Sequence, residues 1–109
     1  MSLAPLADNC LTIAGRVIGP CETRTSPAGI AISRFLLEHH SSQMEADGAR
    51  EVYCRISVLA CGEPIAATAR KLSPETPVRV SGFIARANNR EGAYRLVLHA
   101  ARIDLFDLE

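Results

Sequence analysis

The chain has 109 residues, 48% of them hydrophobic, which is enough for one domain with a modest core. Its twelve basic and twelve acidic residues cancel, and this neutrality argues against a protein that coats nucleic acid through overall charge. A polyanion would therefore have to bind at a local basic patch. All basic residues except Lys71 are arginine, whose planar guanidinium suits contacts with phosphates and bases, although a GC-rich gene would produce the same excess.

The N-terminal residues do not resemble an export signal. Residues 1–9 lack a basic start and an apolar core, and no segment approaches the ~18 apolar residues of a membrane-spanning helix. We therefore expect a cytoplasmic protein with no membrane partner, in which residues 1–109 form one domain and residues 1–8 are flexible. The cysteines match neither a common zinc pattern nor a secreted disulfide framework, and we interpret all four as small core or surface residues: Cys10, Cys21, Cys54 and Cys61.

The first strand is predicted at Leu11–Ile18, where apolar and polar residues alternate. Gly15 in its middle suggests a bulge or a tight bend. Gly19-Pro20 and residues 25–29 carry turn chemistry. The chain should therefore return through a loop into a second strand at Ile30–His40.

A polar segment separates the second and third predicted strands. Residues 41–50 lose all periodicity, which predicts an exposed and mobile hairpin loop. Glu51–Leu59 then alternates cleanly, with apolar residues at every second position from Val52 to Val58, as in a strand with one wet face. Tyr53 and Arg55 should project from that face side by side, where they could hold a base against a phosphate. Alternatively, Tyr53 packs in a protein interface.

The second half of the chain predicts one helix and two strands. The helix lies between Gly62 and Ser73, where Pro64 precedes an alanine-rich run. A fourth strand follows at Val78–Ala85, then a turn at residues 88–92 and a fifth strand from Tyr94 to Leu105. Three strands, one short helix and two strands are typical of the OB-fold, an all-β, five-stranded Greek-key barrel that binds oligonucleotides or oligosaccharides over one face. Other small barrels have similar element counts, so the order is suggestive only.

An arginine-rich turn joins the last two predicted strands. Arg86, Arg90 and Arg95 lie within ten residues and are opposed only by Glu91. Two strands and their turn would bring these charges over one edge, where they could neutralise phosphates and make binding salt-dependent. A simply solvated loop is the alternative. Four further arginines of the predicted strands either extend the patch or are plain surface charges: Arg16, Arg34, Arg79 and Arg102.

Neither catalysis nor metal binding is indicated. The chain has no Gly-rich phosphate loop, no nucleophile elbow and no helical pair of metal ligands. His39 and His40 are adjacent on a strand, so they point to opposite faces and cannot easily share an ion. We therefore predict no enzyme, no cofactor and no metal site. Residues 103–109 mix acidic and apolar residues, and they form either a strand end or a short partner-binding segment.

Several short motifs carry a resemblance to a known family: Gly15 with Val17, Ser26-Pro27-Ala28-Gly29-Ile30, Phe35-Leu36-Leu37-Glu38-His39, Cys54, Val80-Ser81-Gly82-Phe83-Ile84, and Leu96-Val97-Leu98-His99-Ala100 with Ile103. In order and spacing they resemble the primosomal replication protein N (PriB) family over residues 9–107. The resemblance implies an OB-fold homodimer of the bacterial cytoplasm that binds single-stranded DNA without catalysis. It also implies a role in restarting stalled replication forks, with the helicase PriA and then DnaT as partners.

The resemblance also implies DNA-binding positions. Tyr53 corresponds to a tryptophan on the family's DNA face. Basic positions of the family are matched by Arg24, Arg50, Arg90 and Arg95. Two positions depart from the family pattern, because Asn88 replaces an expected lysine and Gly48 occupies an aromatic site.

Together these observations predict a DNA-binding module of the replication-restart primosome. Single-stranded DNA would lie across Tyr53, Arg55 and the loop that carries Arg86 and Arg90, and the module would bridge this DNA to PriA. The alternative is a protein–protein adaptor of the primosome that binds DNA only weakly.

Overall fold

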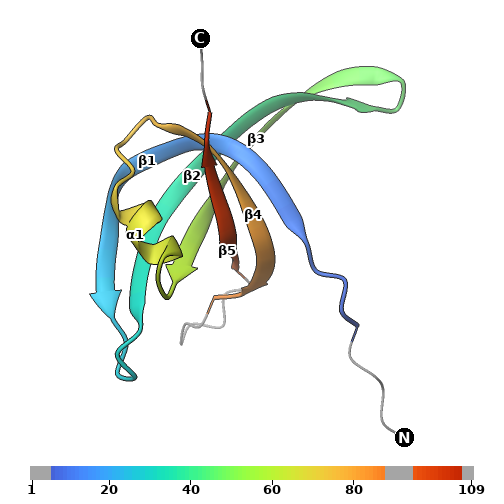
Figure 1. Cartoon of the computed structure of the whole chain (residues 1–109). Helices are drawn as coiled ribbons and strands as arrows, with labels where there is room; N and C mark the ends of the chain where they lie inside the picture. The colour runs from blue at the N-terminus through green and yellow to red at the C-terminus, as the bar shows by residue number, and fades with distance from the viewer. Residues whose placement is uncertain (1–5, 88–94, 107–109) are drawn as a thin grey trace, which may run out of the picture.

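In the part of the chain that the structure describes, five strands close into one barrel with a short helix packed against it (Figure 1). This computed structural model describes residues 6–87 and 95–106. The elements are β1 (Leu11–Thr25), β2 (Ala31–Glu45), β3 (Gly48–Cys61), α1 (Ile65–Arg70), β4 (Pro77–Arg86) and β5 (Leu96–Leu105). Around the barrel they neighbour one another in the order β1-β2-β3-β5-β4. The predicted OB-fold barrel, with its helix between the third and fourth strands, is confirmed.

Apolar residues at the inward positions of the strands fill the barrel. The largest fully buried apolar side chains are Val17, Leu37, Val58, Val78, Val80 and Leu98. Helix α1 packs against the barrel through Ala66 and Ala69, which are both buried. The hydroxyl of Ser33 on β2 donates a hydrogen bond of 2.8 Å to the Ala66 carbonyl oxygen. Burial of this apolar surface is the main term that favours the fold, and the Ser33 bond removes the cost of an unpaired polar group.

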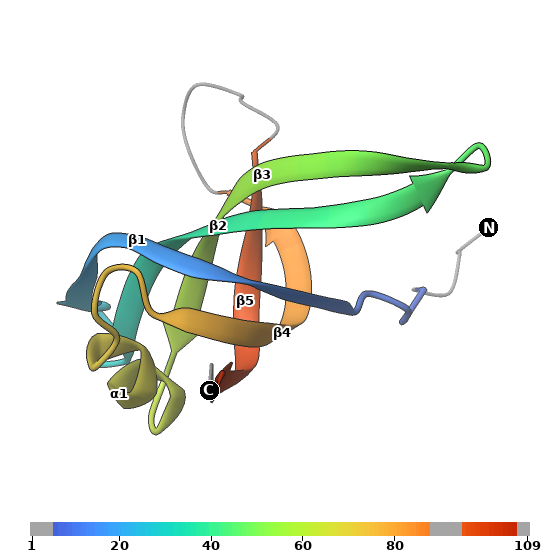
Figure 2. The same ribbon diagram turned by 90° about the horizontal axis from the view of Figure 1, so that it is seen from above.

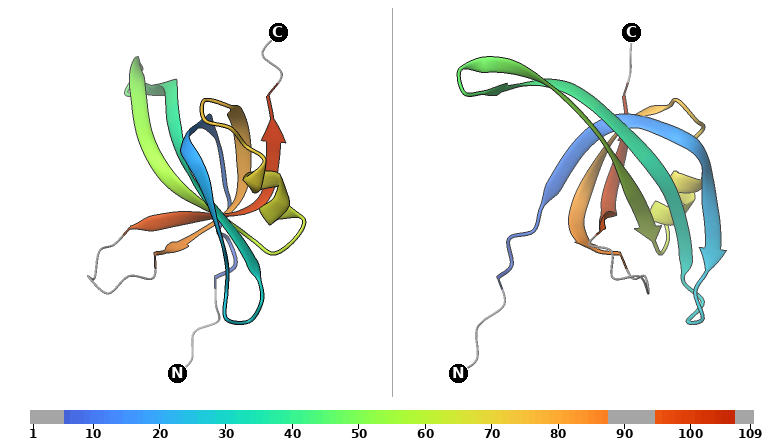
Figure 3. Two further views of the ribbon diagram at one scale, coloured as in Figure 1. Left: turned by 90° about the vertical axis from the view of Figure 1, so that its left-hand side faces the viewer. Right: turned by 180° about the vertical axis from the view of Figure 1, so that it is seen from behind.

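A short parallel contact between β3 and β5 closes the barrel. Residues 57–59 pair there with residues 97–99, whereas the other pairs of strands are antiparallel. Strand β1 lies between β2 and β4 in the barrel and pairs with both. Its residues Leu11–Arg16 pair with β4, and the stretch from Arg16 to Thr25 pairs with β2. Figure 3 shows how β1 bends to reach both partners.

Strand β1 is longer than predicted. The expected turn at Gly19-Pro20 lies inside the strand, which continues to Thr25. The pairing of β1 with β2 shifts register between Ile18 and Glu22, and Gly19 has a positive φ of 71°. The dipeptide therefore forms a bulge, after which the hydrogen-bonded ladder resumes with Glu22 opposite Arg34.

The predicted loop at residues 41–50 is also wrong as secondary structure. Strands β2 and β3 continue through it, and only Ala46 and Asp47 form the turn, with φ of 52° and 64°. Two positive φ values suit a tight two-residue hairpin connection. The hairpin projects beyond the barrel (Figure 2), so both of its faces are exposed and no apolar alternation is needed. Whether residues 41–50 are mobile stays a prediction.

Other predicted boundaries agree to within a few residues. Helix α1 is shorter than the predicted span from Gly62 to Ser73, and the fifth strand begins at Leu96. The predicted turn at residues 88–92, together with Tyr94, lies outside the described residues. The proposed flexibility of residues 1–8 also stays a prediction. No helix among the described residues is long and apolar enough to cross a membrane.

Two glycines allow the strands to approach closely. A Cβ at Gly82 would collide with the carbonyl group of His99 on β5, and a Cβ at Gly15 would collide with that of Glu38 on β2. Gly82 also adjoins a register shift in the pairing of β4 with β5. Glycine is therefore needed at position 15 because the backbones of β1 and β2 approach closely there. The structure has no bulge at Gly15, since no register shift between β1 and a neighbouring strand falls at this residue.

We expect the Gly82→Ala variant to be destabilised by roughly 1–3 kcal/mol, because its methyl group must displace the backbone of β5. Urea unfolding followed by far-ultraviolet circular dichroism measures this loss. Gly48→Ala is the matched control, since its nearest neighbour would lie 3.9 Å from the added Cβ. Equal stability of the two variants would contradict the close approach of β4 and β5.

Candidate nucleic-acid interface

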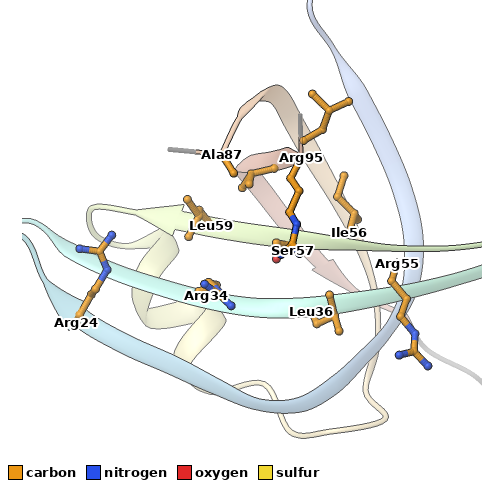
Figure 4. Close-up of a pocket in the computed structure, with 11 residues that line it drawn as sticks. Arg24, Arg34, Leu36, Arg55, Ile56, Ser57, Leu59, Ala87 and Arg95 are labelled. Carbon is orange, nitrogen blue, oxygen red and sulfur yellow. The ribbon is translucent and has the colours of Figure 1, made fainter. Parts of the chain in front are cut away.

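A groove of about 640 Å³ crosses the outer face of the barrel (Figure 4). It is lined by Arg24, Arg34, Leu36, Arg55, Ile56, Ser57, Leu59, Ala87, Arg95, Leu96 and Val97. Most of these residues meet because outward positions of neighbouring strands are in register. Leu36 of β2 lies opposite Ser57 of β3, and Ser57 lies opposite Val97 of β5. The groove is therefore built by the closed barrel and not by one loop.

Four arginines from different segments line this groove. Arg24 lies on β1, Arg34 on β2 and Arg55 on β3, while Arg95 directly precedes β5 and extends toward β3 (Figure 4). Among the described residues, Arg24, Arg34 and Arg95 make no ion pair. A guanidinium is a planar donor that matches the oxygens of a phosphate. The groove therefore concentrates positive charge on a chain that is neutral overall.

Apolar side chains form the floor between these cations. Leu36 and Leu59 are half-buried at outward positions of β2 and β3, and Leu96 is 56% exposed. The flat faces of unpaired bases can pack on such a surface while their phosphates meet the surrounding guanidinium groups. This combination favours a single-stranded nucleic acid over a purely ionic ligand.

The outer face of β2 and β3 continues beyond the groove toward the projecting hairpin. Successive cross-strand pairs of β2 and β3 on this face are Arg34 with Leu59, Leu36 with Ser57, Glu38 with Arg55, and His40 with Tyr53. The Tyr53 side chain is 70% exposed. Its ring stacks on the His40 ring at a centroid distance of 4.2 Å and an interplanar angle of 3°. The His40–Tyr53 pair is thus an exposed aromatic platform beyond the end of the groove.

Two of the predicted DNA-binding arginines are paired with carboxylates. Arg55 Nε lies 2.9 Å from Glu38 Oε2, and Arg50 Nη1 lies 2.7 Å from Glu45 Oε1 near the hairpin turn. All four side chains are exposed enough for water to screen the pairs, so each contributes little to stability. The pairs nevertheless reduce the net positive charge that these two arginines present.

The structure brings some of the predicted site residues together and separates others. Arg24, Arg55 and Arg95 line the groove, whereas Arg86 ends β4 opposite Leu96 and does not line it. Arg90 lies outside the described residues. Tyr53 and Arg55 share the outer face of β3, as predicted.

Sequence reasoning missed part of the site. The sequence pattern indicates for Arg34 either an extension of the patch or a plain surface charge, and it does not predict the apolar floor. Two-residue periodicity relates Arg34, Leu36 and His40 to one face of β2, but it does not reveal which strand lies opposite. The stacking of His40 on Tyr53 depends on that register.

The histidines and cysteines make no metal cluster in the described ranges. His39 Nδ1 lies 2.6 Å from the Ala14 carbonyl oxygen and Nε2 lies 2.7 Å from Ser41 Oγ, whereas His40 belongs to the aromatic platform. No disulfide joins the described cysteines, all of which are free. Cys21 is the least exposed of them, and burial raises the pKa of its thiol.

Comparisons with known proteins agree with a nucleic-acid interface. A family described as "another single-strand binding protein family" matches residues 9–102. The chain is 39% identical over 99 residues to the replication restart protein PriB of Serratia proteamaculans, which covers 91% of this chain and 94% of that protein.

Solved structures show the same likeness. The PriB protein of Ralstonia solanacearum has a TM-score of 0.78 at 30% identity, over 92% of this chain and 100% of that chain. The single-stranded DNA binding protein of Thermus aquaticus has a TM-score of 0.74 at 21% identity, over 92% of this chain and 50% of that chain. The second likeness supports the fold alone.

Cys21 should react more slowly with an aromatic disulfide reagent than the three exposed cysteines. Burial raises the pKa of its thiol, so a smaller fraction is thiolate near pH 8, and access is also restricted. Absorbance should therefore rise in a fast phase from Cys10, Cys54 and Cys61 and a slow phase from Cys21. The Cys21→Ser variant should lose only the slow phase, and a single rate for all four thiols would contradict this assignment.

Proposed function

Since the chain belongs to the replication restart protein PriB family and to the wider single-strand binding protein family, we propose that it binds single-stranded DNA at the groove and the aromatic platform. One observation carries this proposal: Arg24, Arg34 and Arg95 surround an apolar floor without carboxylate partners among the described residues. Phosphates would bind the guanidinium groups, and bases would pack on the floor. This mode requires no base sequence, because every base has an apolar face.

The aromatic platform would hold a further base. Tyr53 is mostly exposed on the projecting hairpin. The His40 ring stacks on one face of the Tyr53 ring and lies parallel to it. A ring held in this way loses little further freedom when a base stacks on its open face. Arg50, Arg86 and Arg90 remain candidates for additional phosphate contacts around this path.

The family membership also supports a place in replication restart. We include in the proposal the helicase PriA and DnaT as partners, a homodimer as the assembly, and the cytoplasm as the location. Phe83 is 47% exposed and stacks on His99 at a centroid distance of 4.9 Å. That apolar surface of β4 and β5 is available to a second copy of the chain.

The prediction that the chain is not an enzyme is confirmed by its family, since PriB and the single-strand binding proteins are non-catalytic DNA-binding proteins. Chemistry on the DNA is therefore not part of the proposed role. The proposed role consists of binding DNA and recruiting protein partners.

The second candidate function is a protein–protein adaptor that binds DNA only weakly. The ion pairs of Arg50 with Glu45 and of Arg55 with Glu38 favour it, because they offset two of the charges that were expected to hold DNA. In that case the same barrel would act mainly through contacts with PriA. Measurements of DNA affinity and of helicase binding on the same variants separate the two functions.

The triple variant Arg24→Ala, Arg34→Ala and Arg95→Ala should bind oligothymidylate more weakly than the native protein. If each arginine meets one phosphate, the slope of log affinity against log salt should become shallower by about two units. Fluorescence anisotropy at several salt concentrations measures both quantities.

The matched control removes three positive charges that do not line the groove, at Arg70, Lys71 and Arg102. It should keep the native slope. Equal losses in both triple variants would mean that overall charge and not the groove attracts DNA. Weak native binding with an unchanged slope, together with capture of the protein by immobilised PriA, would favour the adaptor.

Tyr53→Ala should lose one stacked base, which is worth roughly 1–3 kcal/mol of binding free energy. The salt slope should not change, because no phosphate contact is removed. Tyr53→Phe should bind almost as the native protein does, since the ring remains. Native affinity of the alanine variant would exclude Tyr53 from the DNA path.

A further inference from the structure

One ion pair lies at the end of the groove, between its apolar floor and the aromatic platform. Glu38 of β2 and Arg55 of β3 are directly opposite each other, between the Leu36–Ser57 pair and the His40–Tyr53 pair. Alternate residues of a strand are about 7 Å apart, so this pair occupies the single step between the two surfaces. A DNA strand that uses both the groove and Tyr53 must pass over it.

The Glu38 carboxylate is held loosely. Its contact with Arg55 joins Arg55 Nε and Glu38 Oε2 at 2.9 Å, and within the described part of the chain no other side chain donates a hydrogen bond to it. The Glu38 and Arg55 side chains are 47% and 63% exposed. A guanidinium carries five N–H donors, so Arg55 can meet another anion before the carboxylate leaves, and an exposed pair of this kind is weak.

A carboxylate and a phosphate compete for the same guanidinium. Both are anions that accept hydrogen bonds from the planar fork of arginine. While Glu38 occupies Arg55, it cancels the local charge and also repels a phosphate that approaches from the groove.

We propose that Arg55 is a phosphate subsite masked by Glu38, and that bound DNA displaces the Glu38 carboxylate when it spans from the groove to Tyr53. This inference rests on the proposed function of DNA binding. It assigns Glu38 the role of an internal competitor that lowers affinity for the strand. DNA that binds only around Arg24, Arg34 and Arg95 would leave the ion pair intact, so Glu38 opposes the longer contact specifically.

The test uses Glu38→Gln, which keeps the shape of the side chain and removes its charge. Its matched control is Asp104→Asn, since Asp104 also forms an exposed ion pair, with Arg102 at 2.9 Å, but Arg102, unlike Arg55, does not line the groove. With a long oligothymidylate at low salt, Glu38→Gln should bind roughly two- to fivefold more tightly than the native protein, the range for removing one exposed charge. Its salt slope should steepen by up to about 0.7, and the control should change neither value.

A double-mutant cycle tests whether Glu38 acts through Arg55. Arg55→Gln should weaken binding more in the Glu38→Gln background than in the native background. Without the Glu38 charge, Arg55 contacts a phosphate unopposed, so more binding free energy is lost when Arg55 is removed. Thermal unfolding of each variant confirms that the fold is retained.

The outcomes separate this inference from the function on which it rests. Salt-dependent binding by the native protein with unchanged or weaker binding by Glu38→Gln would overturn the inference alone. An equal gain in Asp104→Asn, or additive effects in the cycle, would also overturn it, since Glu38 would then act only through overall charge. Absence of binding by the native protein and by every variant would overturn the proposed function, and the inference with it.

Discussion

The parallel contact between β3 and β5 is the constraint on which the candidate site depends. Residues 57–59 and 97–99 pair there and close the barrel, and Arg95 directly precedes the strand so placed. The Ala87 amide donates a hydrogen bond of 2.8 Å to the Arg95 carbonyl oxygen, which further fixes the backbone at this point. Arg95 therefore lines the same groove as Arg34 only in the closed barrel. Without closure, the groove would be an open sheet face with fewer cations.

A neutral protein can present a cationic groove because its acidic residues form ion pairs with some of its arginines and not with others. Acidic partners occupy Arg50, Arg55, Arg70 and Arg102, whereas Arg24, Arg34 and Arg95 make no ion pair among the described residues. At a physiological salt concentration, charges farther apart than about 8 Å are largely screened. A phosphate in the groove is therefore influenced mainly by the arginines around it and little by the net charge of the chain.

The sequence predicted the fold well because two-residue periodicity reports burial wherever a strand faces the core. Glu51–Leu59 illustrates this, since Val58 is buried and Tyr53 is exposed as expected. Periodicity fails where neither face is buried, and for that reason the strand pairing of residues 41–50 was mistaken for a loop. It fails again at Gly19-Pro20, because turn residues also make bulges inside strands.

The site was less predictable than the fold. Arg86, Arg90 and Arg95 are close in sequence, which made one loop seem to be the centre of binding. The groove instead gathers Arg24, Arg34 and Arg95 from segments that only the strand order brings together. Ion pairing across β2 and β3 depends on register as well, so the partners of Arg50 and Arg55 could not be inferred from the chain alone.

The two parts of the proposed surface are stabilised differently. The groove lies over the barrel core, so unfolding it locally would expose buried residues such as Leu37 and Val58. The outer hairpin has no such core beneath it, since residues 42–45 and 48–51 are all exposed, and mainly backbone pairing and the His40–Tyr53 stack hold it. Segments with few buried contacts open at lower free energy than a core. The groove is therefore suited to fix the position of a bound strand, and the hairpin is suited to adjust to it.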